Sequence, residues 1–263
     1  MHAAEREQLI LTLLSEKGFV AFQELDRLVD ASPATIRRDL EKLEQTGRII
    51  RVRGGAHPAP IEDAAPSPQL SGVPFHENLS RNLAAKQAIG KAAASLCKNG
   101  DSVIIDGGST TLQMCPALDG LSLQVLTNSI HIVSALLPQP KTSIMLPAGT
   151  VFREQNIVLS PYEEDGMSRF RASRMFMGAA AVGPHGVMQT DVILVRAERR
   201  LISLADELVL LVDSSKFEAP TGNAVCGLED VGVLITDNGI SAATAKEIER
   251  AVGRLIVVPR GGS

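Results

Sequence analysis

The first 56 residues place apolar positions at helical spacing in three successive stretches. These positions are Leu9, Ile10, Leu13 and Leu14, then Phe22, Leu25 and Leu28, and finally Ile36, Leu40 and Leu43. Ser32 is a good N-cap for the third helix and Pro33 suits its first turn, while Thr46-Gly47 ends it. Residues 48–53 alternate basic and apolar side chains before Gly54-Gly55. The pattern therefore predicts three helices and a small β-wing over residues 1–56.

Residues 57–74 hold five prolines, which are Pro58, Pro60, Pro66, Pro68 and Pro74. Proline lacks the backbone N–H that helices and sheets use, so this stretch extends neither structure easily. It is predicted to be a semi-stiff linker between two domains.

From residue 75 onward, short apolar runs alternate with helical patterns, beginning with a long amphipathic helix over Glu77–Leu96. The runs predicted as strands are Ser102–Asp106, Leu123–Thr127, Thr142–Leu146, Met175–Met177, Leu208–Asp213, Val231–Thr236 and Leu255–Val258. Further helices are predicted at Thr110–Leu118, Ile130–Leu137, Val192–Leu204 and Ala242–Val252. Fully apolar strands that alternate with helices imply an α/β domain over residues 75–263, with a mostly parallel sheet covered on both faces.

The distribution of charge along the chain says more about the smaller domain than the net charge does. The chain has 263 residues, of which 44% are hydrophobic and 21% charged, as expected for a globular protein with a substantial core. Its net charge of −4 does not suggest nucleic acid. However, residues 1–32 carry three basic and six acidic side chains, whereas residues 33–56 carry six basic and three acidic ones. Positive charge is thus concentrated on the third predicted helix and the wing.

The composition also disfavours several classes of protein. Aromatic residues make up 3% of the chain, which argues against base stacking on single-stranded nucleic acid. Cys97, Cys115 and Cys226 lie far apart without CxxC spacing, so neither a zinc site nor a disulfide framework is expected. The N-terminus is charged rather than signal-like, and no apolar run reaches the length of a membrane span. We expect a cytoplasmic protein with no metal, no cofactor and no membrane partner.

The second and third predicted helices have the spacing of a helix-turn-helix, whose second helix enters the major groove of DNA. Base contacts come from the N-terminal turn of that helix. Arginine can pair with the edge of guanine or with a phosphate, and threonine can reach a phosphate or a thymine methyl. The residues expected to contact double-stranded DNA from this turn are Ser32, Ala34, Thr35, Arg37 and Arg38.

The wing offers three further contacts, since Arg48, Arg51 and Arg53 are expected to face the DNA backbone or the minor groove. The alternative is a winged helix that contacts another protein. In that case Arg37 and Arg38 would form surface ion pairs with the neighbouring carboxylates, Asp39 and Glu41.

A glycine-rich turn follows the first predicted strand of the larger domain. It comprises Asp106, Gly107, Gly108, Ser109, Thr110 and Thr111. Glycines let the backbone approach a ligand, and the N-terminus of the next helix offers N–H groups that suit phosphate. Asp106 can accept bonds from sugar hydroxyls. Neither GxGxxG nor GxxxxGK[ST] is present, so a nucleotide is not favoured. The alternative is a capped turn that binds nothing.

Two more polar clusters follow predicted strands, one at Thr127, Asn128 and Ser129, the other at Asp213, Ser215 and Lys216. The amide and hydroxyl groups of the first cluster either cap the next helix or bond a ligand. The Lys216 ammonium could neutralise a phosphate or carboxylate. Ligands of open α/β sheets bind at the C-terminal edge of the strands, so the three clusters predict one site.

Two segments of the smaller domain resemble a known family. Residues 32–43 (SPATIRRDLEKL), Gly47 and residues 51–56 (RVRGGA) resemble the signature of the DeoR family of repressors, and the resemblance extends over nearly the whole chain. It implies that the helix-turn-helix binds operator DNA within a dimer or larger oligomer. It also implies that the larger domain is similar to ribose-5-phosphate isomerase and senses a phosphorylated sugar.

The resemblance further implies which residues line the sugar pocket, because the D-x-G-[ST]-T-T, T-N-S and D-x-S-K segments do so in that family. Carried onto this chain, they are Asp106, Gly108, Ser109, Thr110, Thr111, Thr127, Asn128, Ser129, Asp213, Ser215 and Lys216. Lys86, in the first helix of the domain, matches a recurrent family lysine.

The chain departs from the common family pattern in two places. Glu198 stands about where many members have a lysine, and the usually glycine-rich strand end is Pro147-Ala148-Gly149-Thr150. With residues 159–161 and 189–191, these departures resemble the L-ascorbate utilisation repressor branch. Two interpretations of Glu198 stay open: it selects the ligand, or it pairs with Arg199 or Arg200.

Together, these observations predict a DNA-binding repressor of a carbohydrate-utilisation operon that a phosphorylated sugar releases from its operator. The alternative is a phosphosugar isomerase with a DNA-binding appendage. Asp106, Asp213 and Lys216 would supply the base and the cation that isomerisation needs, but no sequence feature fixes their mutual geometry. A complete winged helix-turn-helix favours a sensor, so no enzymatic activity is expected.

Overall fold

The computed structural model describes residues 3–46, 48–52, 54–58, 75–160, 167–219 and 222–260. The chain divides into two compact units, Met1–Ser67 and Pro68–Ser263. Of the predicted linker, residues 59–74 lie outside the described residues.

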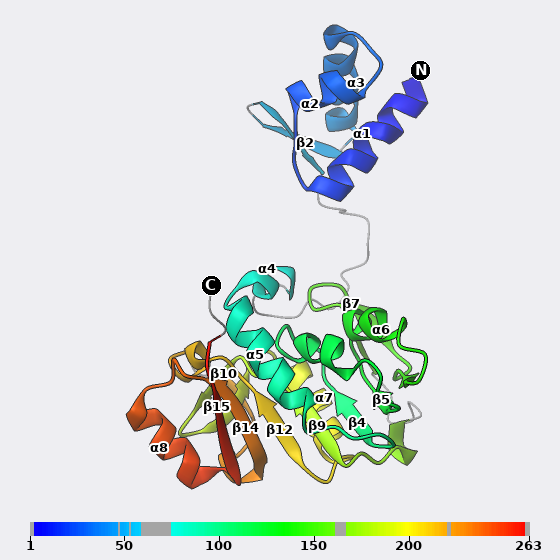
Figure 1. Ribbon diagram of the computed structural model, residues 1–263. Coiled ribbons are helices and arrows are strands. Elements are labelled where there is room, and N and C mark those ends of the chain that lie inside the picture. Colours follow the sequence, from blue (N-terminus) through cyan, green and yellow to red (C-terminus); the bar gives the residue numbers. More distant parts are fainter. Residues whose placement is uncertain are drawn as a thin grey trace. The chain divides into compact units, whose positions relative to one another are not determined.

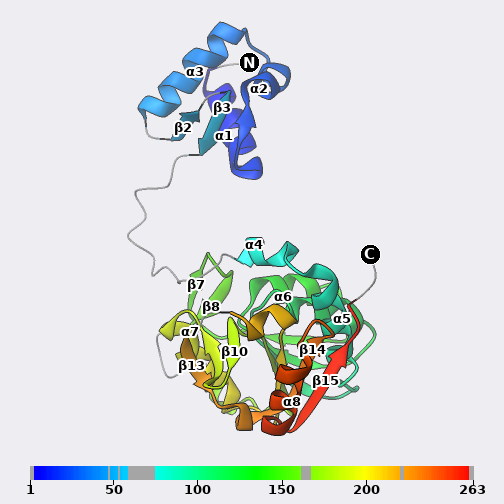
Figure 2. The same ribbon diagram turned by 90° about the vertical axis from the view of Figure 1, so that its left-hand side faces the viewer.

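The smaller unit has the predicted helices and wing (Figure 2). Its helices are α1 (Ala3–Lys17), α2 (Phe22–Leu28) and α3 (Pro33–Gln45). Its strands are β1 (Val20–Ala21), β2 (Ile49–Val52) and β3 (Gly55–Pro58), which pair antiparallel in the order β1-β3-β2. Because β3 pairs with β2 as far as Pro58, His57 and Pro58 belong to the wing, and the linker does not begin at residue 57 as predicted.

The apolar stripes of the three helices meet in one core. Ile10, Leu14, Leu25, Ile36 and Leu43 are each no more than 1% exposed. The predicted inward stripe of α3 is thereby confirmed. Across this core, the Arg6 guanidinium donates to both carboxylate oxygens of Asp39, at 2.8 and 3.2 Å, and so ties α1 to α3.

A seven-stranded parallel sheet forms the centre of the larger unit (Figure 1). Its strand order is β15-β14-β12-β9-β4-β5-β6, and each of the seven apolar runs supplies one strand. The strands are β4 (Ser102–Ile105), β5 (Gln124–Leu126), β6 (Ser143–Met145), β9 (Arg174–Met177), β12 (Leu208–Leu211), β14 (Val231–Asp237) and β15 (Arg254–Val258). The predicted parallel α/β fold is therefore confirmed.

Neighbouring residues of each strand face opposite layers of the domain. Ile105, Phe176 and Leu211 pack in one core with α5 (Leu83–Ala94), η1 (Thr111–Leu118) and α6 (Ile130–Leu136). Met175, Met177 and Leu210 pack in the other core with α7 (Val192–Ile202) and α8 (Ala242–Ala251). Helices cover both faces, which explains why these strands are apolar throughout rather than alternating.

Several elements of the larger unit are absent from the sequence-based expectation. A second antiparallel sheet joins β10 (Ala181–Gly183), β11 (Gly186–Gln189) and β13 (Asn223–Cys226), and a hairpin joins β7 (Thr150–Phe152) and β8 (Ile157–Leu159). Short 3₁₀ turns lie at η2 (Met167–Arg169), η3 (Ser214–Phe217) and η4 (Leu228–Asp230). Strands of three or four residues are too short for a period-2 pattern to stand out.

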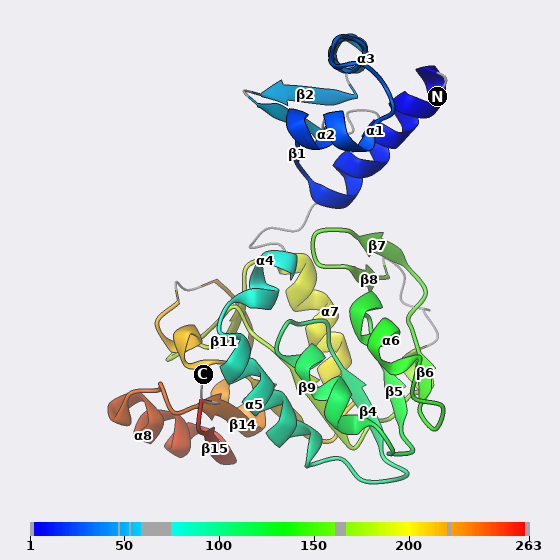
Figure 3. The ribbon, with the colours of Figure 1, turned by 45° about the horizontal axis from the view of Figure 1, so that its top comes forward.

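The long helix predicted over Glu77–Leu96 is two helices, α4 (Phe75–Ser80) and α5, and the prediction of one helix is wrong (Figure 3). Asn82 between them has a left-handed backbone with φ of 52°, which interrupts the helix and turns the chain. Asparagine tolerates this conformation better than most residues. The helix predicted at Thr110–Leu118 is a 3₁₀ helix with Pro116 inside it.

Candidate functional site

The N-terminal turn of α3 is exposed and held by a side-chain cap. The Ser32 hydroxyl accepts from the Thr35 backbone N–H at 3.2 Å and lies 2.9 Å from the Thr35 hydroxyl. Ser32, Ala34, Arg37 and Arg38 are exposed, and Thr35 is half-buried. The turn therefore presents the predicted polar and basic side chains on the surface, opposite the stripe that enters the core.

The carboxylates near Arg37 and Arg38 are bound to other partners. Asp39 accepts from Arg6, and Glu41 lies 3.5 Å from the Arg51 guanidinium. Arg37 instead stacks over the Phe22 ring, with 5.0 Å from its guanidinium carbon to the ring centroid. Within the described residues, Arg38 forms no ion pair. The alternative in which Arg37 and Arg38 pair with Asp39 and Glu41 therefore does not describe this structure.

The wing arginines differ from one another. Arg48 is exposed. Arg51 lies 3.5 Å from Glu44 as well as from Glu41, and its backbone N–H donates to Glu44, so it braces the wing against α3. Arg53 lies outside the described residues. A contact between Arg51 and DNA would thus require it to leave these carboxylates.

In the larger unit, a polar cavity of about 370 Å³ lies where the central strands end. It is lined by the residues that follow β4, β5, β9 and β12, which are neighbours in the sheet. β4 and β9 are the strands at which the chain order reverses direction across the sheet, and such switch points are where open α/β sheets bind ligands. Seven predicted residues line it: Asp106, Gly107, Gly108, Ser109, Thr110, Asn128 and Lys216.

The turn after β4 is fixed by Asn128. Its side-chain oxygen accepts from the Gly107 N–H at 2.9 Å, and its side-chain nitrogen donates to Asp106 Oδ1 at 2.9 Å. A Cβ on Gly107 would lie 2.5 Å from the Ile157 side chain, so any larger residue there would have to displace Ile157. Among the described residues, none accepts from the N–H groups of Gly108, Ser109 or Thr110. These groups, at the start of η1, are available to an anion.

Burial dominates the electrostatics of this turn. It raises the pKa of Asp106 to about 6, although hydrogen bonds from Asn128 and from the Gly107 backbone lower it in part. The half-buried Lys216 and the exposed Arg81 line the same cavity and bring positive charge to it. The cavity therefore combines a carboxyl group of raised pKa with cations and N–H donors.

Three predicted ligand residues support the cavity instead of lining it. The Thr111 hydroxyl donates toward the carbonyls of Asp106 and Gly108, at 2.8 and 2.9 Å, and closes the turn. The Thr127 hydroxyl accepts from the Ser129 N–H at 3.1 Å. Ser129 caps α6 by accepting from Ile132. The capping interpretation therefore describes Ser129, and these three buried side chains hold the loops that carry their neighbours.

A second group of predicted residues holds α4 in place. The Asp213 carboxylate accepts from Asn82 at 2.8 Å and from the Ser215 hydroxyl at 2.5 Å. Lys86 donates to the backbone carbonyl of Asn78 on α4. Lys86 is buried, and burial lowers its pKa to about 8, while the charge of Asp213 offsets part of this effect. None of Asp213, Ser215 and Lys86 lines the cavity, but together they position a helix that does.

The residues that α4, β11 and α7 bring to the cavity are not predicted from the sequence. Phe75, Asn78 and Arg81 come from α4 or its end, while Gln189 and Glu198 come from β11 and α7. In the sequence, the one indication of these lining residues is Glu198, which stands about where many family members have a lysine. Its proposed pairing with Arg199 or Arg200 is wrong, because Oε1 of Glu198 accepts from Gln189 at 2.6 Å and Arg199 donates to the carbonyls of Val225 and Ala224.

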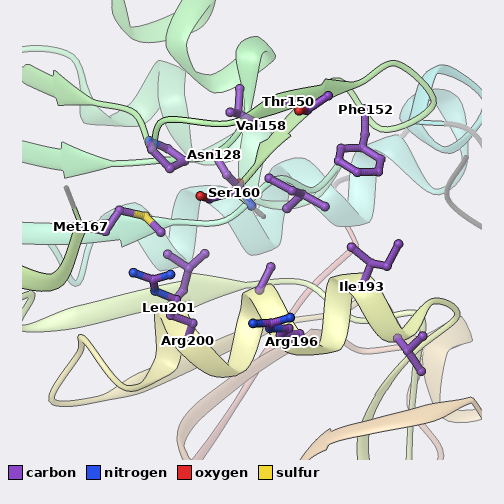
Figure 4. Close-up of a pocket in the computed structure, with 14 residues that line it drawn as sticks. Asn128, Thr150, Phe152, Val158, Ser160, Met167, Ile193, Arg196, Arg200 and Leu201 are labelled. Atoms are coloured by element: carbon purple, nitrogen blue, oxygen red, sulfur yellow. The ribbon is translucent and has the colours of Figure 1, made fainter. Parts of the chain in front are cut away.

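A larger cavity, of about 500 Å³, lies on another side of α7 (Figure 4). Figure 4 shows Ile193, Arg196 and Arg200 of α7 on one wall and Thr150, Phe152 and Val158 of the β7–β8 hairpin on the other. Its wall is mostly apolar, and Ser160 and Met167 in it flank residues 161–166, which the structure does not describe. The smaller cavity has the polar groups that a charged ligand needs.

Other kinds of site find no support in the described part of the chain. All three cysteines have free thiols. No group of three or more histidine, cysteine and acidic side chains there could hold a metal ion. No helix among the described residues is both long and apolar enough to cross a lipid bilayer.

Similarity to solved structures is weak. Ribose 5-phosphate isomerase A from Neisseria gonorrhoeae shares 15% identity, with a TM-score of 0.38 over 53% of this chain and 55% of that one. The enzyme from Methanocaldococcus jannaschii shares 18% identity, with a TM-score of 0.37 over 54% and 55% of the two chains. Scores this low do not establish a common fold, so the isomerase-like architecture stays a prediction.

Proteins with similar sequences identify the family of this chain. The chain is 30% identical to the HTH-type transcriptional regulator UlaR of Shigella dysenteriae and to that of Escherichia coli K12. Each match covers 95% of this chain and 96% of the relative. Residues 6–59 match the profile of the DeoR-like helix-turn-helix domain, and residues 81–238 match that of the DeoR C terminal sensor domain. The chain therefore belongs to the DeoR family of helix-turn-helix transcriptional regulators.

Proposed function

We propose that this protein represses a carbohydrate-utilisation operon and leaves its operator when a phosphorylated sugar fills the 370 Å³ cavity. The observation that carries the proposal is the position of that cavity. It lies at the ends of four central strands and is also lined by α4, the first described element after the residues that join the two units. A ligand in the cavity therefore contacts α4, the helix that follows the residues joining the two units.

The DNA contacts are assigned to α3 and to the wing. The exposed turn of α3 enters the major groove, where Arg37 and Arg38 reach base edges or phosphates and Thr35 reaches a phosphate or a methyl group. Arg48 contacts the DNA backbone from the wing. Two such units in a dimer or tetramer bind two half-sites one or more helical turns apart, so the assembly is part of the proposal.

We assign the ligand contacts to two kinds of lining group, the donors and cations that suit a phosphate and the carboxyl group that suits sugar hydroxyls. The N–H groups of Gly108, Ser109 and Thr110 hold the phosphate, and Lys216 and Arg81 neutralise its charge. Asp106 accepts hydrogen bonds from sugar hydroxyls. Sugar phosphates of four to six carbons are small enough for a cavity of about 370 Å³.

The coupling between ligand and DNA is assigned to α4. The Phe75 N–H donates to the carbonyl of Glu154 at 2.9 Å, and its ring stacks on His131 with centroids 4.4 Å apart. A ligand that contacts Phe75, Asn78 or Arg81 changes how firmly this helix is held. A tenfold loss of operator affinity requires only about 1.4 kcal/mol of coupling free energy.

The test uses the full chain and an operator fragment selected from random duplexes. Fluorescence anisotropy of the labelled fragment is followed while members of a panel of sugar phosphates are added. At least one member is expected to release the wild-type protein. Lys216→Ala is expected to need a higher concentration of that sugar, whereas Lys246→Ala on the exposed surface of α8 is the matched control. Release of Lys216→Ala at the wild-type concentration would show that the cavity is assigned wrongly.

The proposal includes the absence of catalysis. The relatives that cover 95% of this chain are named as transcriptional regulators. Within the cavity, Asp106 is bonded to Asn128, and Asp213 lies outside the lining, so the base and cation suggested for an isomerase do not all face one ligand. Incubation with the same sugar phosphates is expected to give saturable binding without conversion, and conversion would support the enzyme instead.

A further inference from the structure

The place of Lys216 in the cavity wall depends on η3, the single 3₁₀ turn that carries it after β12. A turn of four residues is not stable by itself, so contacts from other elements must fix its position. Such contacts come from the end of β14, the neighbour of β12 in the sheet, and from the end of β15, the edge strand beyond it (Figure 1).

Asp237, the last residue of β14, binds the first residue of this turn. Its side chain is fully buried. Oδ1 accepts from the Ser214 N–H at 2.7 Å, and Oδ2 accepts from the Ser214 hydroxyl at 3.1 Å. Oδ2 also accepts from the Gly239 N–H at 2.9 Å. A buried carboxylate is costly unless it is both hydrogen-bonded and paired with a cation, so this arrangement needs a positive partner.

Arg260, two residues after β15, supplies that cation. Its Nε donates to Asp237 Oδ2 at 2.6 Å, and its Nη2 donates to the Ser214 hydroxyl at 2.7 Å. Its backbone N–H donates to the side-chain oxygen of Asn238 at 3.1 Å, which holds the segment itself in place. The planar guanidinium presents several donors in a fixed arrangement. One side chain therefore joins the end of β14 to the start of η3.

The backbone at Gly239 leaves the space that the guanidinium occupies. A Cβ there would overlap both the Arg260 guanidinium and the Ser214 hydroxyl. Arg260 is not among the described residues that line the cavity, and 57% of its side chain is exposed. The proposed function uses neither Arg260 nor Asp237, although both bind the turn that carries Lys216.

We propose that Arg260 is a positioning residue, which together with Asp237 holds η3 so that the Lys216 ammonium stays in the cavity wall and meets the phosphate. The proposal rests on the phosphosugar site proposed above and adds to it a residue outside the cavity. Arg260 acts through Lys216 and not through its own charge, because that charge is paired with Asp237. The segment after β15 thereby affects ligand binding without contact with the ligand.

The test is a double-mutant cycle on the full chain. The probe is the sugar phosphate of the panel that releases wild type from operator at the lowest concentration, and calorimetric titration gives its dissociation constant. Arg260→Ala is expected to raise this constant about fivefold or more, since residues of one hydrogen-bond network are coupled. In the Lys216→Ala background, the same substitution is expected to change the constant less than about twofold.

Two further variants separate position from charge. Gly239→Ala keeps every charge but takes the space of the guanidinium, so it is expected to weaken probe binding as Arg260→Ala does. Arg254→Ala is the matched control, because it removes the same charge from the exposed start of β15. It is expected to keep the wild-type dissociation constant.

Several results would overturn this inference while leaving the phosphosugar site intact. Wild-type affinity in Arg260→Ala or in Gly239→Ala would show that η3 keeps its position without this guanidinium. An equal effect of Arg260→Ala in both backgrounds would show that Arg260 acts independently of Lys216, through its charge or through the fold as a whole. A loss in Arg254→Ala as large as that in Arg260→Ala would do the same. If no member of the panel bound wild type, the proposed phosphosugar function would fall, and the role of Arg260 with it.

Discussion

At the scale of single residues, Asp106 makes the stability of the larger unit depend on pH. Its folded pKa of about 6 lies above the usual value of 3.8, because burial disfavours the charged form. The stabilising contribution of the protonated form is complete below the unfolded pKa. It is lost as the pH rises through the folded value. The loss therefore falls between about pH 4 and pH 6.

Asp106→Asn cannot ionise, so it avoids this loss. At pH 4 we expect the free energy of unfolding of the variant to be equal to or lower than that of wild type. Between pH 4 and pH 7 the free energy of unfolding of wild type is expected to fall by about 3 kcal/mol relative to that of the variant. Urea unfolding at the two pH values measures the change. Asp119→Asn, at an exposed position, is the control. A difference between variant and wild type that did not change with pH would contradict the burial of an ionising group at this position.

At the scale of elements, the start of α3 permits a matched comparison of two caps. Ser32 accepts from the Thr35 N–H at 3.2 Å, and Ser241 accepts from the Thr244 N–H at 3.1 Å at the start of α8. Loss of either cap is expected to cost about 1 kcal/mol of helix stability. Only Ser32→Ala is expected to weaken operator binding, because only α3 is assigned to DNA. Equal operator affinity of Ser32→Ala and Ser241→Ala would contradict that assignment.

The break between α4 and α5 depends on both the backbone and the side chain of Asn82. The side chain donates to Asp213 at 2.8 Å, and the backbone has φ of 52°. Asn82→Ala loses the bond and strains a left-handed residue, so we expect a loss of about 2–3 kcal/mol in the free energy of unfolding. Asn82→Gly loses the bond alone and is expected to be about 1 kcal/mol more stable than Asn82→Ala. Equal stability of the two variants in urea would show that the left-handed backbone is not strained.

The same break shows what the sequence could predict and what it could not. The loop Asp106–Thr110 was predicted because an apolar strand, a glycine turn and a helix start are adjacent in the chain. The helical period continues through Asn82, so nothing local marked the turn that brings Phe75 and Arg81 to the cavity. Likewise, whether Glu198 faces the cavity or solvent depends on how α7 packs on the sheet, which a single helical pattern does not determine.

At the scale of the whole molecule, repression and release require that one binding event alters another through a shared element. In the proposed mechanism this element is α4, because its residues line the cavity and its first residue is held by His131 and Glu154. Coupling between two binding sites is reciprocal, so a ligand that weakens operator binding must itself bind less tightly to the DNA-bound protein. The coupling free energy is RT times the natural logarithm of the ratio of the operator dissociation constants measured with and without saturating ligand.

Phe75→Ala removes the stacked ring while leaving α3 and the turn after β4 in place. We expect the variant to bind operator like wild type in the absence of ligand, and to lose most of the release that saturating sugar phosphate causes. The reason is that a ligand acts on DNA affinity only through an element whose state it changes. Saturating ligand keeps any loss of sugar affinity from imitating lost coupling. Leu137→Ala, a change at an exposed apolar residue at the end of α6, is the control. If Phe75→Ala kept the wild-type ratio of dissociation constants, the Phe75 ring and its contact with His131 would not carry the signal.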